Sequence, residues 1–139
     1  MPIVKVYPRT EVHFDEILTR LDHQCFPSDE IYQAGPQDHH WWIAFDEKRA
    51  VAFAGMRVDK NNRAFFCRAG VIKSHRGLGL HLALIRRRLS CCRRLGLDQA
   101  YTYTLFNNLA SSKNLVRCGF HLSNYSTDRR LLWWTRQLT

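Results

Sequence analysis

The sequence predicts a strand-rich α/β fold, and two observations support that prediction. Apolar residues alternate with polar ones along several short segments, whereas in other segments they recur at helical spacing. In mid-chain, a strand pattern leads through two glycines directly into a helix pattern. The chain has 139 residues, of which 45% are hydrophobic and 12% aromatic, so it can bury a core of its own. We therefore expect a single domain over residues 1–139.

The first half of the chain is expected to supply four strands and one helix. Apolar or alternating runs bounded by turn residues predict strands at Ile3–Tyr7, Trp41–Phe45, Ala50–Val58 and Ala64–Ile72. Between the first two strands, the spacing of apolar residues predicts a helix at Glu11–Phe26, which Pro27 ends. The polar stretch Ser28–His40 contains Gly35-Pro36, and we expect it to be a loop with a short helix.

The second half is expected to alternate between helices and strands. A helix follows the glycine turn and ends at Gly96. Its apolar side is marked by Leu80, Leu84, Leu89 and Leu95. Its polar side is expected to hold Arg86, Arg87, Arg88, Arg93 and Arg94. A short helix is predicted at Asn108–Arg117, closed by Gly119, and strands are predicted at Gln99–Phe106, Phe120–Tyr125 and Arg130–Gln137.

Charge and cysteine content limit the class of protein. With 21 Lys and Arg against 12 Asp and Glu, the net charge of +9 suits a nucleic acid, an anionic cofactor or an acidic protein, or serves solubility alone. No apolar run approaches the roughly 20 residues of a membrane span, and no secretory signal is visible. The five cysteines match neither a disulfide framework nor a zinc-finger spacing. We therefore expect no metal site, no membrane partner and a cytoplasmic protein with free thiols.

The segment Arg76-Gly77-Leu78-Gly79 has the features of a phosphate-binding turn. Glycines let the backbone come close to a ligand and point successive N–H groups at it, and the following helix adds the positive end of its dipole. No Gly-Lys-Ser/Thr follows, which excludes a P-loop, and Leu82 stands where a dinucleotide fingerprint has its third glycine. The turn therefore predicts a phosphate site of another kind.

A second segment, Asn108–Phe120, completes a pattern that the glycine turn begins. Ser74–Gly79 is similar to the Gln/Arg-x-x-Gly-x-Gly/Ala pyrophosphate loop of the GNAT superfamily of acyl-CoA-dependent N-acyltransferases, and Asn108–Phe120 is similar to its Asn-x-x-Ala/Ser…Gly-Phe helix. The resemblance extends over about residues 3–137. It implies the GNAT fold, in which a mixed, mostly antiparallel sheet of six or seven strands is flanked by about four helices.

The same resemblance implies acetyl-CoA, or another acyl-CoA, as cofactor. The backbone N–H groups expected to hold the pyrophosphate are those of Arg76, Gly77, Leu78, Gly79 and Leu80. At the end of the preceding strand, Val71 and Ile72 would pair with the pantetheine arm, while Asn108 would hydrogen-bond the arm with Ser111 nearby. The strand Gln99–Phe106 would diverge from Ala64–Ile72 to open a slot for the thioester.

Two positions depart from the family pattern. Ser74 occupies the first position of the loop motif, and Leu115 stands where many members have the tyrosine that protonates the leaving thiolate. The strand Ala64–Ile72 also lacks the carboxylate that many relatives keep there. The candidates for catalytic acid or base are therefore Ser111, Tyr125 and His75, with Tyr103, Asp46 and Glu47 as further alternatives. His81 is expected either at the cofactor or on the surface.

The acceptor is expected to be a primary amine of a small molecule or a protein, attacking directly within a ternary complex. Deprotonating a lysine at pH 7 costs about 4.6 kcal/mol, whereas an α-amine costs about 1.4 kcal/mol, so a base matters more for lysine. The acceptor site is expected around Ser28–His40, whose acidic residues suit a cationic amine. Trp41 and Trp42 are expected either to wall that site or to pack in a strand.

Two other functions remain open from the sequence alone. A catalytically weak GNAT-fold protein that docks on an acidic protein partner is the main alternative. A nucleic-acid-binding module ranks below it, because no recognition signature accompanies the arginine-rich helix. Those arginines are expected to form a solvated face, to contact the 3′-phosphate of the cofactor, or to form such a docking surface. A homodimer is also left open.

Overall fold

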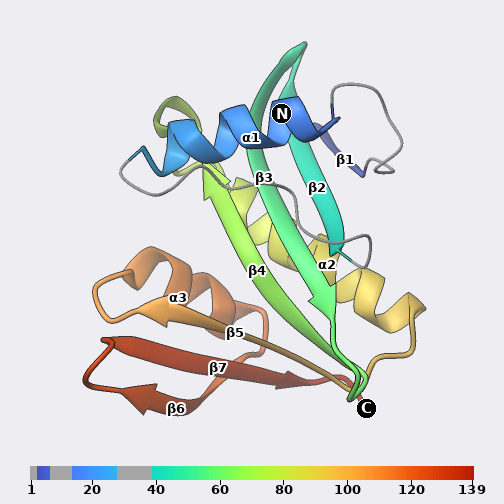
Figure 1. Ribbon diagram of the computed structural model, residues 1–139, viewed down its shortest axis with the longest axis vertical. Helices are drawn as coiled ribbons and strands as arrows, with labels where there is room; N and C mark the ends of the chain where they lie inside the picture. The colour runs from blue at the N-terminus through green and yellow to red at the C-terminus, as the bar shows by residue number, and fades with distance from the viewer. Residues whose placement is uncertain (1–2, 7–13, 28–38) are drawn as a thin grey trace.

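The computed structural model describes residues 3–6, 14–27 and 39–139, and its strands form one seven-stranded sheet (Figure 1). The strands lie in the order β1-β2-β3-β4-β5-β7-β6. All neighbours are antiparallel except β4 and β5, which are parallel. The strand bounds are β1 Ile3–Val6, β2 His39–Asp46, β3 Arg49–Val58, β4 Arg63–Val71, β5 Gln99–Leu105, β6 His121–Ser126 and β7 Leu131–Gln137. The mixed, mostly antiparallel sheet is thus confirmed.

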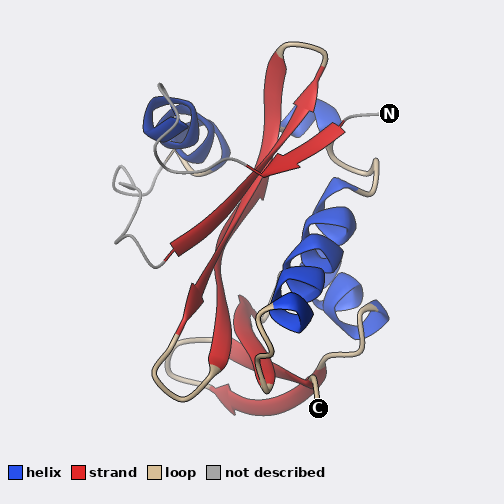
Figure 2. Ribbon diagram, turned by 90° about the vertical axis from the view of Figure 1, so that its right-hand side faces the viewer, coloured by secondary structure: helices blue, strands red, loops and turns tan. Residues whose placement is uncertain are grey.

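Helices cover both faces of the sheet. The α-helices are α1 Phe14–Cys25, α2 Leu80–Arg94 and α3 Leu109–Arg117. Figure 2 shows α1 on one face and the other two α-helices on the opposite face. A 3-10 helix at Lys73–His75 leads into α2, so the described residues hold three α-helices and one 3-10 helix. None of these helices is long and apolar enough to span a bilayer.

The polar stretch Ser28–His40 lies mostly outside the described residues, as does the short helix expected in it. Its last two residues are not loop but begin β2, because His39 and His40 pair with Arg57 and Met56 of β3 and extend the ladder.

Trp41 and Trp42 follow and are both buried. Adjacent strand residues point to opposite faces, and a helix layer covers each face, so both tryptophans belong to the core rather than to a substrate wall.

The prediction that all five arginines lie on the polar side of α2 is wrong for Arg88, which is only 2% exposed. Arg88 follows Leu84 by four residues and precedes Cys92 by four, so it lies on the buried stripe of the helix. Leu95, expected on that stripe, is exposed because it is the C-cap residue beyond the last turn. Arg93 lies in the last turn, about 20 Å of helix from the glycine turn, which excludes it from a phosphate contact there.

The parallel pair β4 and β5 separates along its length. Register pairs join Arg63, Ala64 and Phe65 of β4 to residues 99–101 of β5, and no further pair follows. The Thr102 hydroxyl still donates to the Phe66 carbonyl at 2.7 Å. Beyond this point the strands diverge toward α3, as Figure 1 shows. The splay expected from the sequence is therefore present, and it opens at the carboxyl ends of two parallel strands.

Candidate active site

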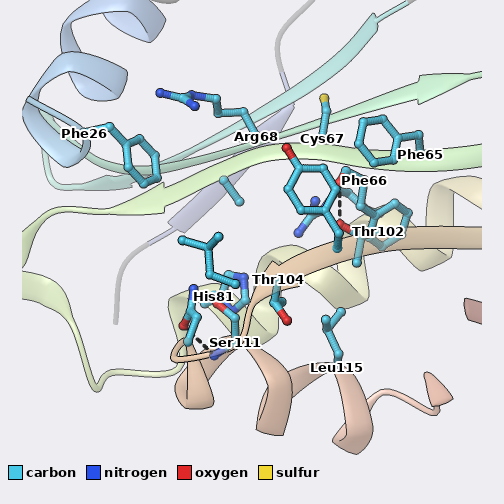
Figure 3. Close-up of a pocket in the computed structure, with 15 residues that line it drawn as sticks. Phe26, Phe65, Phe66, Cys67, Arg68, His81, Thr102, Thr104, Ser111 and Leu115 are labelled. Atoms are coloured by element: carbon cyan, nitrogen blue, oxygen red, sulfur yellow. Dashed lines mark hydrogen bonds between the residues drawn. The ribbon is translucent and has the colours of Figure 1, made fainter. Parts of the chain in front are cut away.

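Two adjoining cavities occupy the region where β4 and β5 separate. The slot cavity, of about 620 Å³, lies between the two strands, and the loop cavity, of about 610 Å³, lies beside the glycine turn. Both are lined by Phe26, Ala69, His81, Asn108 and Ser111. One path therefore runs from the glycine turn, past the start of α3, into the space between the strands. Figure 3 shows the side chains that line the slot cavity.

The glycine turn forms an open backbone cradle. Gly77 and Gly79 have φ of 78° and 83°, a left-handed conformation that favours glycine. A Cβ added at either residue would meet no atom within 4 Å, so a ligand can approach the backbone closely. The first turn of α2 has no side-chain cap and no acidic residue, which leaves its N–H groups available to an anion.

Cationic side chains complete the loop cavity. Arg76, Lys113 and Arg117 line it, the last two from α3, and no carboxylate of the described chain does so. Of the predicted turn residues, Gly77, Gly79 and Leu80 also line it, whereas the Leu78 side chain does not. Backbone donors, a helix start and three cations fit the pyrophosphate and phosphate groups of CoA. Sequence spacing did not single out Lys113 and Arg117, because they approach the turn only through the packing of α3.

The end of β4 supplies one of the two residues expected to face the pantetheine arm. Ile72 donates its N–H to the Val51 carbonyl of β3 at 2.9 Å, and its own carbonyl accepts from His75. Both backbone groups of Ile72 are therefore engaged within the protein, and Ile72 lines neither cavity. Its pairing with the arm stays a prediction. Successive strand residues alternate, so Val71 faces the open side, where its carbonyl accepts from Arg76 Nε at 3.1 Å.

Asn108 and Ser111 lie where the two cavities meet. The Asn108 Oδ1 atom accepts from the Ser111 backbone N–H at 3.2 Å and caps α3. Because the cap uses only the oxygen, the amide N–H groups of Asn108 remain available as donors. Both positions suit the predicted contact with the cofactor arm, and that contact stays a prediction.

Of the three residues expected to act as acid or base, His75 and Ser111 both line the loop cavity, and Tyr125 lines neither cavity. His75 lines the loop cavity, where its Nε2 atom is 2.7 Å from Asp46 Oδ2 and its Nδ1 atom 2.8 Å from Ser74 Oγ. Tyr125 lies on β6, is 63% exposed and lines neither cavity. Of the three, only Ser111 lines the slot cavity. The structure therefore brings His75 and Ser111 to one cavity but not Tyr125, and the catalytic roles of all three stay predictions.

The slot cavity is lined by three nitrogen-bearing side chains that the sequence did not place there: His81, Arg68 and Arg88. Arg68 donates to both carboxylate oxygens of buried Asp22, at 2.6 and 3.1 Å, and its guanidinium lies 4.5 Å from the centre of the Phe26 ring. Asp22 and Arg68 are 46 residues apart, so no local pattern signals the pair.

His81 is held as a neutral ring. Its Nδ1 atom lies 3.1 Å from the amide nitrogen of Asn114, which can only donate, so the ring proton is on Nε2. Burial and, secondarily, the charge of Arg88 lower the pKa of His81 to about 4. At neutral pH it is therefore a hydrogen-bond donor into the cavities and a poor base.

Leu115 forms part of the slot wall and is only 3% exposed. It offers no proton where many relatives have a tyrosine. Within the described part of the chain, no carboxylate lines the slot cavity either. The slot therefore combines arginines with uncharged side chains, among them Tyr103, which the sequence offered as an alternative acid. A catalytic role of Tyr103 stays a prediction.

A cradle for an anionic cofactor, continuous with a slot between splayed parallel strands, defines the class of acyl-CoA-dependent acyltransferases. The family described as "Acetyltransferase (GNAT) family" matches residues 8–120, and the chain belongs to it. The resemblance of the two sequence motifs is thereby confirmed. The chain is accordingly an acyltransferase enzyme whose cofactor is an acyl-CoA.

Solved structures of low sequence identity share the whole fold. The Escherichia coli ribosomal-protein-S18-alanine N-acetyltransferase has a TM-score of 0.79 at 13% identity, covering 100% of this chain and 95% of that one. A Bacillus subtilis acetyltransferase in complex with CoA has a TM-score of 0.80 at 13% identity, covering 100% of both chains. A chain of the NatC complex bound to Gag peptide and CoA has a TM-score of 0.81 at 15% identity, covering 99% of both. No curated protein sequence matches this chain.

Proposed function

We propose that this enzyme transfers an acetyl group from acetyl-CoA to a primary amine by direct attack, with both substrates bound together. The observation that carries the proposal is the continuity of the two cavities, because a cofactor held at the glycine turn can extend into a slot that an amine can also enter. Bound acetyl-CoA supplies an activated acetyl group: the N–C bond forms, the C–S bond breaks with its electron pair leaving on sulfur, and a proton passes from nitrogen to sulfur through water.

The residues of the chain bind and orient the reactants in this scheme. Backbone N–H groups of the glycine turn bind the phosphates, and the Asn108 amide donates to the arm. The outward backbone groups of Val71 lie along the path of the arm. Phe66 and Leu115, both buried, exclude water from the end of the slot. Positioning and exclusion of water suit a reaction in which one reactant is already activated.

An α-amino group is the acceptor that the slot supports best. Arg88 lines the slot and opposes an ammonium ion, whereas the charge of Arg68 is balanced by Asp22. No carboxylate of the described lining assists deprotonation of the amine. An α-amine needs less help than a lysine, since it loses its proton at a cost of about 1.4 rather than 4.6 kcal/mol at pH 7. Two proteins of the same fold have names that fit such an acceptor: the S18-alanine N-acetyltransferase and the peptide-bound NatC complex. We propose an α-amine carried by a peptide or by a small molecule.

Two further proposals concern the protein as a whole. All seven strands join one sheet, which supports a single domain over residues 1–139. The five cysteines are free thiols, which supports a reducing compartment such as the cytoplasm.

A carboxylate introduced into the glycine turn by substitution tests cofactor binding. Gly79→Glu places a negative charge where the pyrophosphate is expected, so acetyl-CoA should raise the Tm of the wild type but not of this variant. Gly96→Glu is the matched control, because Gly96 has a φ of 69°, open space at its Cβ and a place at the other end of α2. The Gly96→Glu variant carries the same added charge and the same backbone strain as Gly79→Glu, and acetyl-CoA should raise its Tm as much as that of the wild type.

Thiol release from acetyl-CoA with a set of amines and peptides tests the transfer itself. Release that depends on a free α-amine supports the proposal. No Tm shift at millimolar acetyl-CoA in the wild type would exclude the cofactor site. A normal shift without thiol release for any amine would favour the catalytically weak binding protein instead.

A further inference from the structure

Arg88 is a buried cation whose contacts with the described residues are all uncharged. Its Nε donates to the Leu84 carbonyl at 3.2 Å and its Nη1 to the Gly55 carbonyl at 3.3 Å. Its guanidinium carbon lies 4.4 Å from the centre of the Phe66 ring, a cation–π contact. Burial lowers the pKa of Arg88 to about 10, so the side chain stays protonated at neutral pH. The side chain is therefore fixed in place with its charge intact.

No anion within the described part of the chain balances this charge. The ionisable groups around it are Cys67 of β4, Cys92 of its own helix, Cys118 after α3, and His81. Burial raises the pKa of Cys67 and Cys118, and that of Cys92 to about 12, while His81 stays neutral. All four are uncharged at neutral pH. A buried charge without a counter-ion is costly for folding, which indicates that it is retained for another reason.

The position of Arg88 shows where an anion would meet it. Arg88 lines the slot cavity together with His81 and Leu115. The loop cavity, where the phosphates are expected, reaches the slot past Asn108 and Ser111. A cofactor that enters along this path brings its thioester end to the wall that holds Arg88. During transfer, breaking of the C–S bond leaves the electron pair, and hence negative charge, on sulfur.

We propose that Arg88 is a catalytic residue that stabilises the negative charge on the departing CoA sulfur, at a site where Leu115 provides no acid. The inference rests on the proposed acetyl transfer. The sulfur then takes its proton from water, so Arg88 needs to supply only its charge. A fixed charge aimed at a developing anion in a cavity sheltered from water is an effective form of catalysis.

The test compares Arg88→Gln, which is neutral but still polar, with Arg93→Gln on the exposed side of the last turn of α2. For Arg88→Gln we expect kcat to fall about 100-fold with little change in the KM for acetyl-CoA. We expect the Tm without ligand to stay equal or to rise, because an unpaired buried charge is removed. Arg93→Gln should match the wild type in all three measurements.

Calorimetric binding of CoA provides a readout that does not depend on turnover. A free thiol ionises near pH 8.5, so between about pH 7 and pH 9 the wild type should gain up to about tenfold in affinity for CoA relative to acetyl-CoA. Arg88→Gln should lose this gain, and Arg88→Lys should keep part of it. A Tm that falls sharply in Arg88→Gln, with the pH-dependent gain intact, would assign Arg88 a purely structural role. Failure of the wild type to bind acetyl-CoA would instead overturn the proposed function.

Discussion

Arg88 and His81 lie seven residues apart on α2, two helical turns, and therefore on the same face. Their positions fall on the buried stripe that Leu84, Ile85 and Cys92 mark. Helical periodicity alone thus predicts burial, whereas their residue types indicated a polar surface. The two side chains violate the rule that charged and polar groups face water, and both line the slot cavity. Such local conflicts are expected at functional sites.

His81 should make the stability of the protein depend on pH. Its pKa of about 4 in the folded protein lies below the ordinary 6.5, so the unfolded chain takes up a proton first as the pH falls. The contribution of His81 to stability is therefore complete above about pH 6.5 and is lost on acidification toward pH 4. Between about pH 7 and pH 5 the loss should be about 2 kcal/mol. Urea unfolding of the wild type and of His81→Gln at both pH values measures it.

The chain contains six other histidines, so the difference between the two proteins is the quantity that isolates His81. A wild type and a His81→Gln variant that lose the same free energy of unfolding would show that His81 is not held neutral. In that case the neutral donor assigned to the junction of the two cavities would be wrong as well.

At the scale of elements, the start of α3 combines a structural and a binding role in one side chain. Asn108 caps the helix through its oxygen and leaves its amide N–H groups at the cavity junction. Asn108→Asp should separate the two roles, because aspartate keeps the cap but offers no donor. We expect the free energy of unfolding to change by less than about 0.5 kcal/mol, while acetyl-CoA affinity falls about tenfold. Denaturant unfolding and calorimetry measure the two quantities.

Asn108→Ala is the companion variant, since it removes the cap and the donors together. It should lose about 1 kcal/mol of stability in addition to the loss of affinity. Unchanged affinity in Asn108→Asp would show that the amide does not bind the cofactor arm. The role of Asn108 would then be limited to capping.

The elements themselves follow closely from local sequence. Gly96 and Gly119 end their helices with positive φ, as the sequence predicts, because a left-handed residue at that place favours glycine. The glycine turn is predictable for the same reason. The exposure expected of Arg88 was wrong, and the backbone of Ile72 is already engaged, because both depend on which side of a helix or strand faces a neighbour. That is decided by tertiary packing, such as the bond from Ile72 to Val51.

At the scale of the whole molecule, which has a net charge of +9, the positive side chains near the site form two separate groups. The loop cavity is lined by cations from the turn and from α3, where a polyanionic cofactor is expected. The slot contains Arg68, paired with Asp22, and the unpaired Arg88. The cofactor end was predictable because one contiguous segment builds it. The opening of the slot was expected from the family resemblance, but its lining was not predictable, because it is assembled from residues such as Thr102 and Phe66 that are 36 positions apart.

The cationic slot leads to the last prediction, which concerns the choice of acceptor. A peptide with a free α-amine and no lysine is compared with an N-terminally blocked peptide of similar sequence that contains one lysine. The two deprotonation costs differ by about 3.2 kcal/mol, so at about pH 7 the α-amine peptide should have a kcat/KM about 200-fold higher. The kcat/KM of the α-amine peptide should level off above about pH 8, while that of the lysine peptide continues to rise toward pH 10, so the ratio of the two values falls with pH.

Equal kcat/KM values for the two peptides at about pH 7, with a kcat/KM for the lysine peptide that does not change with pH, would require a base beyond the described lining of the slot. Without such a base, the enzyme selects its acceptor by the pKa of the amine as well as by shape, since the charge of Arg88 disfavours an ammonium group at the point of attack.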